Sequence, residues 1–295
     1  MIAVDHLAVV GVGLIGGSFA KALRAAGKVG RITGIGRSEA NLLEAKRLGI
    51  IDHYAMDLVA VAGADLIMVA VPMGAYGQVF SALELHARAD AIITDAGSTK
   101  QHAIRMAEQF LTAPGRFVPA HPIAGAEHSG AAAASVDLFV DRLVVITPTP
   151  KSESQLVGRV TDLWQTIGAN VVEMDAKQHD QFLAAVSHLP HLAAFALVNA
   201  VAAQGDGAHD PFGFAAGGFR DFTRIASSSP VMWRDIALTN REALLASIDA
   251  MAGQLAQLRG AIAQGDGALL LEHFTKAKAA RDGWLARSEG GMIGG

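Results

Sequence analysis

Three short stretches of the chain carry residue types that can act together in one active site. Residues 11–18 are rich in glycine, residues 121–130 begin with a histidine, and residues 218–226 hold two arginines. A glycine-rich turn binds phosphates, a histidine transfers protons near neutral pH, and an arginine binds carboxylates with two parallel donors. Together these stretches predict a nicotinamide-dependent dehydrogenase that acts on an acidic substrate.

The glycine stretch has the spacing of a dinucleotide-binding turn. It follows the apolar run 7–10 and precedes a segment with apolar residues at helical spacing, which is the context that this motif requires. The first glycine permits a tight turn, the second lets a pyrophosphate approach the backbone, and the third lets the helix pack closely on the strand. The predicted cofactor-binding residues of the turn are Gly11, Gly13, Leu14, Ile15 and Gly16. The alternative is a glycine-rich turn that binds no ligand.

The choice of cofactor depends on the end of the second predicted strand. Enzymes that use NAD usually place a carboxylate there, which accepts hydrogen bonds from the ribose. This chain has Arg37 and Ser38 instead, and both side chains suit a 2′-phosphate, so NADP is favoured. Glu39 is near enough to keep NAD open, and a solvated arginine at a helix start is the alternative for Arg37. Val71 and Pro72, which follow the next strand, are expected to line the cofactor.

His121 is the predicted catalytic base. It follows the apolar run 117–120, so we expect it at the carboxyl edge of the sheet, facing the cofactor. Ser98 follows the neighbouring strand and is expected to fix the imidazole tautomer or to bind substrate. The structural alternatives are a histidine that caps a turn and a serine that caps the helix ahead of Gln101.

Up to residue 176 the sequence alternates short β-branched runs with segments of helical spacing, the pattern of parallel βαβ units. The predicted strands are residues 7–10, 31–35, 66–70, 91–94, 143–146 and 170–173. The predicted helices are residues 15–26, 39–48, 75–85 and 101–110. The predicted fold class is therefore α/β, with a Rossmann-type, doubly wound and mostly parallel sheet in a dinucleotide-binding domain of residues 1–176.

The rest of the chain, residues 177–295, is predicted to be an all-helical substrate and dimerisation domain. Long alanine- and leucine-rich segments at 179–204, 233–258 and 268–288 replace the β-branched runs. These segments are apolar over more than one face, which suits helices that pack against a second copy of the chain. We therefore expect a homodimer formed through this domain.

The composition restricts the partners and the location. The formal net charge of −4 provides no field that attracts nucleic acid or an anionic membrane, and cysteine is absent, which excludes disulfides and thiolate chemistry. We expect no charge-free apolar stretch of about 18 residues, hence no membrane span, and a cytoplasmic protein without a secretory signal. Pro190 separates His188 from His191, and no glutamate accompanies them, so no metal site is expected.

The chain resembles the prephenate/arogenate dehydrogenase family over nearly its whole length. The resemblance rests on residues 13–18, 95–100, 121–125, 187–191, 218–226 and 232–235. It implies the oxidative decarboxylation of prephenate or arogenate with hydride transfer to NAD(P), a reaction that aromatisation of the ring drives. The implied product is 4-hydroxyphenylpyruvate or tyrosine.

The resemblance also implies roles for individual residues. His121 would accept the proton of the substrate 4-hydroxyl, and Ser98 would position His121 and the substrate. Arg224 would pair with a substrate carboxylate, while His191 and Glu127 would shape the pocket around the substrate side chain. These roles agree with the residue chemistry, because a dianionic substrate needs a fixed donor and a developing carbonyl needs a nearby base.

The second arginine of the third stretch, Arg220, is expected to be structural and to pair with Asp221 or Asp235. We also expect Phe219 and Phe222 of this stretch to lie in the core.

From the sequence, two alternative functions and the choice of substrate remain open. One alternative is a β-hydroxyacid dehydrogenase or imine reductase, but hydroxyacid enzymes carry a catalytic lysine, and no lysine lies between Lys177 and Lys276. Another is a non-catalytic NADP-binding sensor. The preference between prephenate and arogenate is also open, and tyrosine, which resembles the product, is expected to inhibit competitively.

Overall fold

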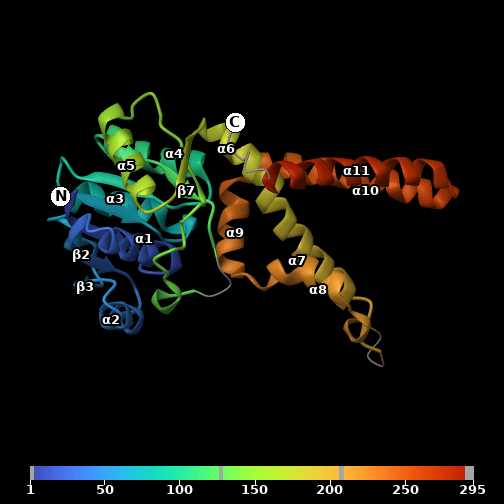
Figure 1. Ribbon diagram of the computed structural model, residues 1–295, viewed down its shortest axis with the longest axis horizontal. Coiled ribbons are helices and arrows are strands. Elements are labelled where there is room, and N and C mark those ends of the chain that lie inside the picture. Colours follow the sequence, from blue (N-terminus) through green and yellow to red (C-terminus); the bar gives the residue numbers. More distant parts are fainter. Residues whose placement is uncertain (1–2, 126–128, 206–208, 290–295) are drawn as a thin grey trace. The chain divides into compact units, whose positions relative to one another are not determined.

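The computed structural model describes residues 3–125, 129–205 and 209–289. The chain divides into two compact units, Met1–Arg241 and Glu242–Gly295. The first unit contains both sheets and the helices that follow them, and the second contains two long helices (Figure 1).

Six parallel strands form the main sheet of the first unit, in the order β3-β2-β1-β4-β5-β6. The strands are β1 (Val4–Val10), β2 (Val29–Ile35), β3 (His53–Ala55), β4 (Leu66–Val69), β5 (Ile92–Asp95) and β6 (Phe117–Val118). The helices between them are α1 (Leu14–Ala25), α2 (Glu39–Arg47), α3 (Tyr76–His86) and α4 (Lys100–Phe110). This strand order is that of a doubly wound dinucleotide-binding sheet, so the predicted fold class is confirmed.

Helices cover both faces of the main sheet. Alternate side chains of β1 point to opposite faces: Leu7 lies in one buried cluster with Phe19 of α1, and Ala8 lies in the other with Phe80 of α3. Burial of each large apolar side chain contributes about 1.5–3 kcal/mol, so the two clusters hold the sheet rigidly between its helices. A rigid sheet fixes the positions of the loops at its carboxyl edge.

A second, three-stranded sheet corrects the sequence prediction, which counted residues 143–146 and 170–173 among the strands of the main parallel sheet. Strands β7 (Ala120–Pro122), β8 (Leu143–Ile146) and β9 (Asn170–Glu173) form this sheet, with β7 antiparallel to β8. Pro119 separates β6 from β7, and because proline has no backbone N–H it interrupts the parallel ladder at this point. Helix α5 (Ser154–Thr166) lies between β8 and β9 in the chain.

The first unit also contains the helices that follow residue 176, where the sequence prediction places the start of the helical domain. Its remaining helices are α6 (Ala176–Leu183), the π-helical turn η5 (Ala184–His188), α7 (Leu189–Ala202), α8 (Gly217–Thr223) and α9 (Pro230–Thr239). Short 3₁₀ turns are η1 (Leu58–Val61), η2 (Met73–Ala75), η3 (Pro114–Arg116), η4 (Ala131–Ala133), η6 (Pro211–Phe214) and η7 (Arg224–Ser227). Helix α6 packs against α4, so these helices belong to the same compact unit as the sheets.

The alanine- and leucine-rich segment 233–258 lies in two helices, because the first of them ends at Asn240. This residue ends α9, and its side-chain amide donates to the carbonyl of Asp180 at 2.8 Å and contacts Nδ1 of His188 at 3.1 Å. The long helix α10 (Arg241–Gln264) then begins, and after a turn at Gly265 helix α11 (Gly267–Glu289) follows. These two helices make up the second unit.

The expectation that no uncharged apolar stretch reaches the length of a membrane span is wrong. The continuous helix Ala176–Ala202 is long and apolar enough to cross a membrane by length and composition, and little of it is buried within the chain. It contains no Asp, Glu, Lys or Arg between Asp180 and its end. Length and composition alone are weak evidence for a membrane helix, since a helix that packs against protein meets the same criteria.

Candidate active site

The glycine turn after β1 has the geometry that a bound pyrophosphate requires. Gly11 has a φ of +98°, and a Cβ there would lie 2.3 Å from the carbonyl oxygen of Ala70. A Cβ at Gly16 would lie 2.3 Å from the carbonyl oxygen of Gly11, whereas nothing lies within 4 Å of the corresponding position at Gly13. The turn is therefore tight at its first glycine, closely packed at its third, and open at its second, as the dinucleotide motif requires.

The start of α1 supplies backbone donors to this open space. Helix α1 begins at Leu14, and Gly13 precedes it without a side chain that could cap the first amides. The amides of Leu14 and Ile15 have no carbonyl partner within the helix, so they are available to a phosphate at the positive end of the helix dipole.

The loop after β4 lies against the glycine turn. A Cβ at Gly11 would lie 3.1 Å from Cγ1 of Val71, and the amide of Ala70 donates to the carbonyl of Val10 at 2.8 Å. Pro72 is the N-cap residue of the short turn η2, and the amide of Gly74 in that turn donates to a carboxylate oxygen of Asp235 at 3.2 Å. This loop therefore connects the nucleotide turn to helix α9.

The residues that follow β2 present a mixed set of groups. Arg37 is exposed, and Ser38 is the N-cap of α2, where its hydroxyl accepts the amide of Asn41 at 3.3 Å. The hydroxyl proton of Ser38 stays available to another acceptor. The Glu39 carboxylate accepts the hydroxyl of Tyr54 at 3.1 Å.

His121 lies in β7, directly after the point where the chain leaves the main sheet. It is buried, and its Nδ1 atom lies 2.8 Å from Nε2 of His179, with the ring centroids 5.0 Å apart. His179 therefore occupies the Nδ1 side of His121, and the predicted part of Ser98 in fixing the imidazole tautomer stays a prediction. Ser98 lies half-buried in the loop between β5 and α4, and its predicted contact with substrate stays a prediction.

His179 is itself held by the next residue. Its Nδ1 atom lies 2.8 Å from Oδ1 of Asp180, and both side chains are fully buried. Asp180 also caps α4, accepting the amide of Lys100 at 2.7 Å and the amide of Gln101 at 3.0 Å. The alternative in which Ser98 caps this helix is therefore wrong, since Thr99 is the N-cap residue and the capping carboxylate comes from α6.

A buried ion pair holds the backbone on the other side of His121. The ammonium of Lys100 donates to Oδ2 of Asp95 and to the carbonyl of Ala120, each at 2.6 Å. The other oxygen of Asp95 accepts the amide of Ala120 at 2.9 Å, and the hydroxyl of Tyr76 donates to Oδ2 at 2.8 Å. Because Ala120 precedes His121, this network fixes the backbone from which the imidazole projects.

Burial keeps the imidazole of His121 uncharged. Desolvation lowers its pKa well below the usual histidine value, and the neighbouring charges of His179, Lys100 and His188 lower it further. Desolvation also lowers the pKa of His179, although Asp180 opposes this effect. A neutral imidazole at physiological pH has a free lone pair, which a general base requires.

A second group of aromatic and basic side chains lies on α7 and α9. The rings of His191 and Trp233 are stacked, with centroids 3.8 Å apart, and Nδ1 of His191 lies 2.8 Å from the carbonyl oxygen of Ser187. Desolvation lowers the pKa of His191, and the charge of Arg224 lowers it further, which places this arginine near the ring. His188 belongs to the same group, because its ring lies edge to face with Trp233 and the centroids are 6.0 Å apart.

The sequence also carries predictions for Arg220, Phe222 and Glu127. Asp235 does not pair with Arg220; it accepts two hydrogen bonds from Arg234, at 2.9 and 2.6 Å. The prediction that Phe222 lies in the core is wrong, because its side chain is about half exposed. Glu127 lies outside the described residues, so its predicted role stays a prediction.

Sequence reasoning missed three residues of the site: Lys100, His179 and Asp180. Lys100 stands in the stretch 95–100, which carries part of the family resemblance. Nothing in the sequence of that stretch indicates that the lysine side chain is buried. The histidine–aspartate pair had a detectable signal, since it directly precedes the long uncharged run of helix 176–202. Among the described residues, no group of three or more His, Asp or Glu side chains is placed to hold a metal ion.

Comparisons with known proteins indicate one family over most of the chain. The family model of the prephenate dehydrogenase nucleotide-binding domain matches residues 19–173, and that of the prephenate dehydrogenase dimerization domain matches residues 175–276. The cyclohexadienyl dehydrogenase of Zymomonas mobilis is 38% identical over 279 residues, which cover 94% of each chain. The prephenate dehydrogenase of Bacillus subtilis is 37% identical over 293 residues, covering 98% of this chain and 78% of the relative.

Solved structures of prephenate and arogenate dehydrogenases are also similar to this chain. The structure of A. aeolicus prephenate dehydrogenase in complex with hydroxyphenyl propionate and NAD+ matches with a TM-score of 0.89 and 36% identity, covering 94% of this chain and 97% of that one. The Synechocystis arogenate dehydrogenase matches with a TM-score of 0.79 and 28% identity, covering 95% and 99%. These matches do not favour a hydroxyacid dehydrogenase, an imine reductase or a sensor. The chain belongs to the prephenate dehydrogenase family, a family of oxidoreductases.

Proposed function

We propose that this protein catalyses the oxidative decarboxylation of prephenate or arogenate, with hydride transfer to a nicotinamide dinucleotide. The observation that supports this most directly is the buried, uncharged His121 at the same edge of the sheet as the glycine turn. Contacts between neighbouring strand ends lead from the turn to the base. Gly11 packs on Ala70, and the amide of Ala96 donates to the carbonyl of Val69 at 3.0 Å. Oδ1 of Asp95 accepts the amide of Ala120, which precedes His121. A base and a nucleotide turn at the same edge of one sheet suit the removal of a proton and a hydride from one carbinol.

His121 performs the proton transfer in this scheme. The lone pair of its Nε2 atom accepts the proton of the ring 4-hydroxyl as the carbon–oxygen bond gains carbonyl character. The nicotinamide, when bound, supplies the acceptor for the hydride. Loss of carbon dioxide then returns electrons to the ring, and the oxygen, now phenolic, takes the proton back from His121.

Arg224 and His191 are proposed to bind the substrate side chain. A guanidinium pairs with a carboxylate through two parallel hydrogen bonds, and the stacked His191 and Trp233 rings form a rigid wall beside it. A pocket of this kind accepts both the keto acid of prephenate and the amino acid of arogenate. The names of the relatives cover both substrates, since they include prephenate, arogenate and cyclohexadienyl dehydrogenases.

The test of the proposed function is the initial rate of nicotinamide reduction with purified protein. Prephenate and arogenate are each supplied with NAD and with NADP. We expect turnover in at least one of the four pairings, and the pairing with the highest kcat/KM identifies substrate and cofactor together. No turnover in any pairing, with cofactor binding still detectable by calorimetry, would reject the function.

NADP is proposed as the better cofactor. The exposed guanidinium of Arg37 and the free hydroxyl proton of Ser38 suit a 2′-phosphate, while Glu39 already accepts a hydrogen bond from Tyr54. The variant Arg37→Ala is expected to raise KM for NADP by roughly tenfold or more and to leave KM for NAD nearly unchanged, because one charge-assisted contact contributes about 1.5–3 kcal/mol. An equal effect on both cofactors would assign Arg37 to another role.

A homodimer through the helical part of the chain is also proposed. The family model that matches residues 175–276 describes a dimerization domain, and large apolar side chains are exposed on these helices. The exposed ones include Phe182, Val186, Leu238, Leu245, Leu255, Ile262, Leu271 and Phe274. One chain has a mass of 30.6 kDa, and light scattering of the purified protein is expected to give twice this value.

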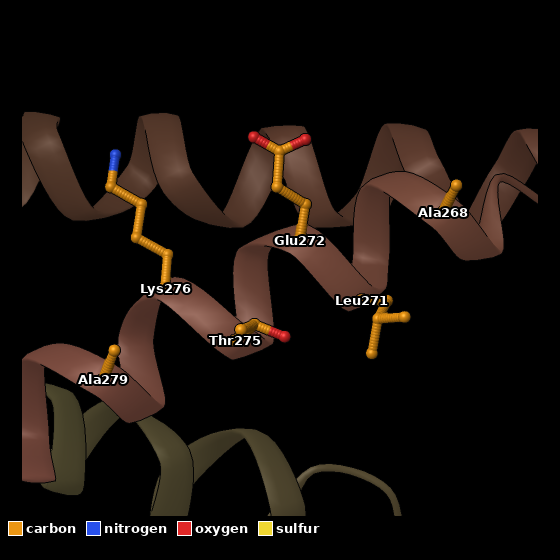
Figure 2. A pocket seen from close by; sticks show the side chains of 6 residues that line it. All are labelled: Ala268, Leu271, Glu272, Thr275, Lys276 and Ala279. Atoms are coloured by element: carbon orange, nitrogen blue, oxygen red, sulfur yellow. The ribbon is translucent and has the colours of Figure 1, made fainter.

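Helix α11 has a surface suited to such an interface. A shallow hollow on this helix is lined by Ala268, Leu271, Glu272, Thr275, Lys276 and Ala279 (Figure 2). These positions recur every three or four residues, so they form one stripe along the helix. Alanines at both ends of the stripe let another helix approach closely. None of the predicted site residues lines this hollow, so we propose that it serves packing.

Tyrosine is proposed to inhibit by competing with the substrate, because it resembles the aromatic product. Initial rates at several tyrosine concentrations are expected to show a raised apparent KM and an unchanged kcat. A lowered kcat with unchanged KM would place tyrosine at a different site.

A further inference from the structure

His121, His179 and Asp180 form a continuous hydrogen-bonded chain within the first unit. Nδ1 of His121 lies 2.8 Å from Nε2 of His179, and Nδ1 of His179 lies 2.8 Å from Oδ1 of Asp180. All three side chains are buried, and the two histidine rings meet edge to face at 67°. The Asp180 end of the chain lies in the protein interior, so the Nε2 atom of His121 is the end that can meet a substrate.

The hydrogen bonds of Asp180 determine how the protons are placed along this chain. Its carboxylate accepts the amides of Lys100 and Gln101, and the side-chain amide of Gln101 at 3.3 Å. Burial raises the pKa of Asp180, but the hydrogen bonds from His179 and from the two amides outweigh it and lower the pKa below the usual value. An ionised carboxylate only accepts, so the bond to His179 requires a proton on Nδ1 of that ring.

The tautomer of His121 follows from the tautomer of His179. A neutral His179 that carries its proton on Nδ1 has a lone pair on Nε2, so it accepts from Nδ1–H of His121. The Nε2 atom of His121 then carries no proton. An unprotonated Nε2 is the form that can act as a base, whereas the other tautomer would present an N–H to the substrate.

We propose that His179, held by Asp180, is a positioning residue that fixes His121 in the tautomer with a free Nε2 lone pair and orients its ring. This proposal deepens the proposed function and rests on it. During the reaction the 4-hydroxyl proton moves to Nε2 of His121, and the Nδ1 proton stays in its hydrogen bond to His179. The imidazolium is stabilised through His179 by the carboxylate of Asp180, and the Nε2 proton later returns to the phenolic oxygen. A buried aspartate that holds a histidine base in the required tautomer serves the same purpose in serine proteases.

The other charged groups around His121 do not provide this stabilisation. The ammonium of Lys100 lies on the main-chain side, where it is paired with Asp95, and its charge opposes protonation of His121. His188 also opposes it, and its own Nδ1 is in contact with the amide of Asn240. Asp180, acting through His179, is therefore the carboxylate that hydrogen bonds connect to His121.

The kinetic test uses two substitutions at one position. His179→Phe keeps a ring of similar volume but removes the acceptor, whereas in His179→Gln the amide oxygen can still accept from Nδ1–H of His121. We expect His179→Phe to lower kcat by roughly 10²–10⁴-fold, the range of general base catalysis, with little change in substrate KM. We expect His179→Gln to recover at least about a tenth of the wild-type kcat, since it keeps the tautomer.

A matched control comes from another buried histidine. His6 lies in β1, where its ring nitrogens contact the carbonyl of Gly63 and the hydroxyl of Thr33, each at 2.8 Å. The variant His6→Gln is expected to lower the thermal midpoint and to leave kcat unchanged. If His179→Phe behaves like His6→Gln, or if His179→Gln is as slow as His179→Phe, the positioning role is overturned.

A spectroscopic test does not depend on turnover. Nitrogen-15 chemical shifts of labelled histidines report which ring nitrogen is protonated. In the wild-type protein we expect Nδ1–H and a bare Nε2 for His121, and in His179→Phe a mixture of tautomers. A His121 that carries its proton on Nε2 in the wild type overturns the proposal. A wild type with the expected tautomer but without turnover rejects the proposed function and leaves the tautomer assignment intact.

Discussion

The carboxylate of Asp180 accepts the backbone amide of Lys100 at 2.7 Å, which fastens helix α6 to the first turn of helix α4. Residues 80 positions apart in the chain are thereby joined at the place where the sheet ends and the helical part begins. The same two residues both act on the surroundings of His121: the Lys100 side chain holds the preceding backbone, and Asp180 holds His179. The base is thus positioned by both parts of the first unit.

Replacement of the base is expected to abolish most turnover. His121→Asn should lower kcat by about 10²–10⁴-fold while cofactor and substrate still bind, because the amide cannot accept the proton. Stopped-flow rates and calorimetric binding measure the two effects separately. Near-normal turnover in this variant would remove His121 from the mechanism.

The pH dependence of the rate should reflect the burial of His121. Desolvation, together with the charges of His179, Lys100 and His188, holds its pKa well below the usual histidine value of 6.5. The neutral, active form therefore persists as the pH falls through 6.5, and kcat/KM should decline only at lower pH. A profile from about pH 5 to about pH 9 measures this limb. An acid limb with its midpoint at or above 6.5 would contradict the burial of the base.

Stability should also fall in mildly acidic solution. Desolvation lowers the pKa of His188 from 6.5 to about 4, so between these values the unfolded chain binds a proton that the folded chain does not. The free energy of unfolding therefore decreases as the pH drops through this window, by about 3 kcal/mol for this residue. Urea unfolding of the wild type and of His188→Gln measures the difference. Parallel pH dependences in the two proteins would show that His188 does not contribute.

The two arginines of the third stretch should differ in their effect on substrate affinity. Arg224→Ala is expected to raise the substrate KM by roughly 10-fold or more, because a charge-assisted hydrogen bond contributes about 1.5–3 kcal/mol. Arg220→Ala, four positions earlier on an exposed helix, is the control and should leave KM unchanged. The reverse order of effects would exchange the roles of the two residues.

The glycines of the nucleotide turn should separate binding from stability. Gly13→Ala adds a methyl group where nothing lies within 4 Å, so the fold should keep its thermal midpoint while cofactor affinity falls. Gly16→Ala places its methyl group 2.3 Å from the carbonyl oxygen of Gly11, so it should lower the midpoint itself. Calorimetric cofactor binding and thermal unfolding check both variants. Unchanged cofactor binding in Gly13→Ala would show that the phosphates bind elsewhere.

Local patterns in the sequence were enough to predict the nucleotide-binding part of the fold. Apolar runs such as residues 7–10 and 66–70 end at glycine or proline turns, and a glycine that needs a positive φ, such as Gly11, is visible from residue type alone. His121 could be singled out for the same reason, because it directly follows an apolar run. The hydrophobic period, the turn chemistry and the residue type depend on residues a few positions apart. They can therefore be recognised from the sequence alone.

The tertiary structure alone decided what surrounds the base. His179 reaches His121 across 58 positions because α6 packs on α4, and the Lys100 side chain reaches the carbonyl of Ala120, 20 positions later in the chain. The separate second sheet and the helix break at Asn240 likewise follow from pairings between distant segments. Such contacts depend on burial and hydrogen bonding between segments that are far apart in the chain. The spacing of residues in the sequence does not indicate them.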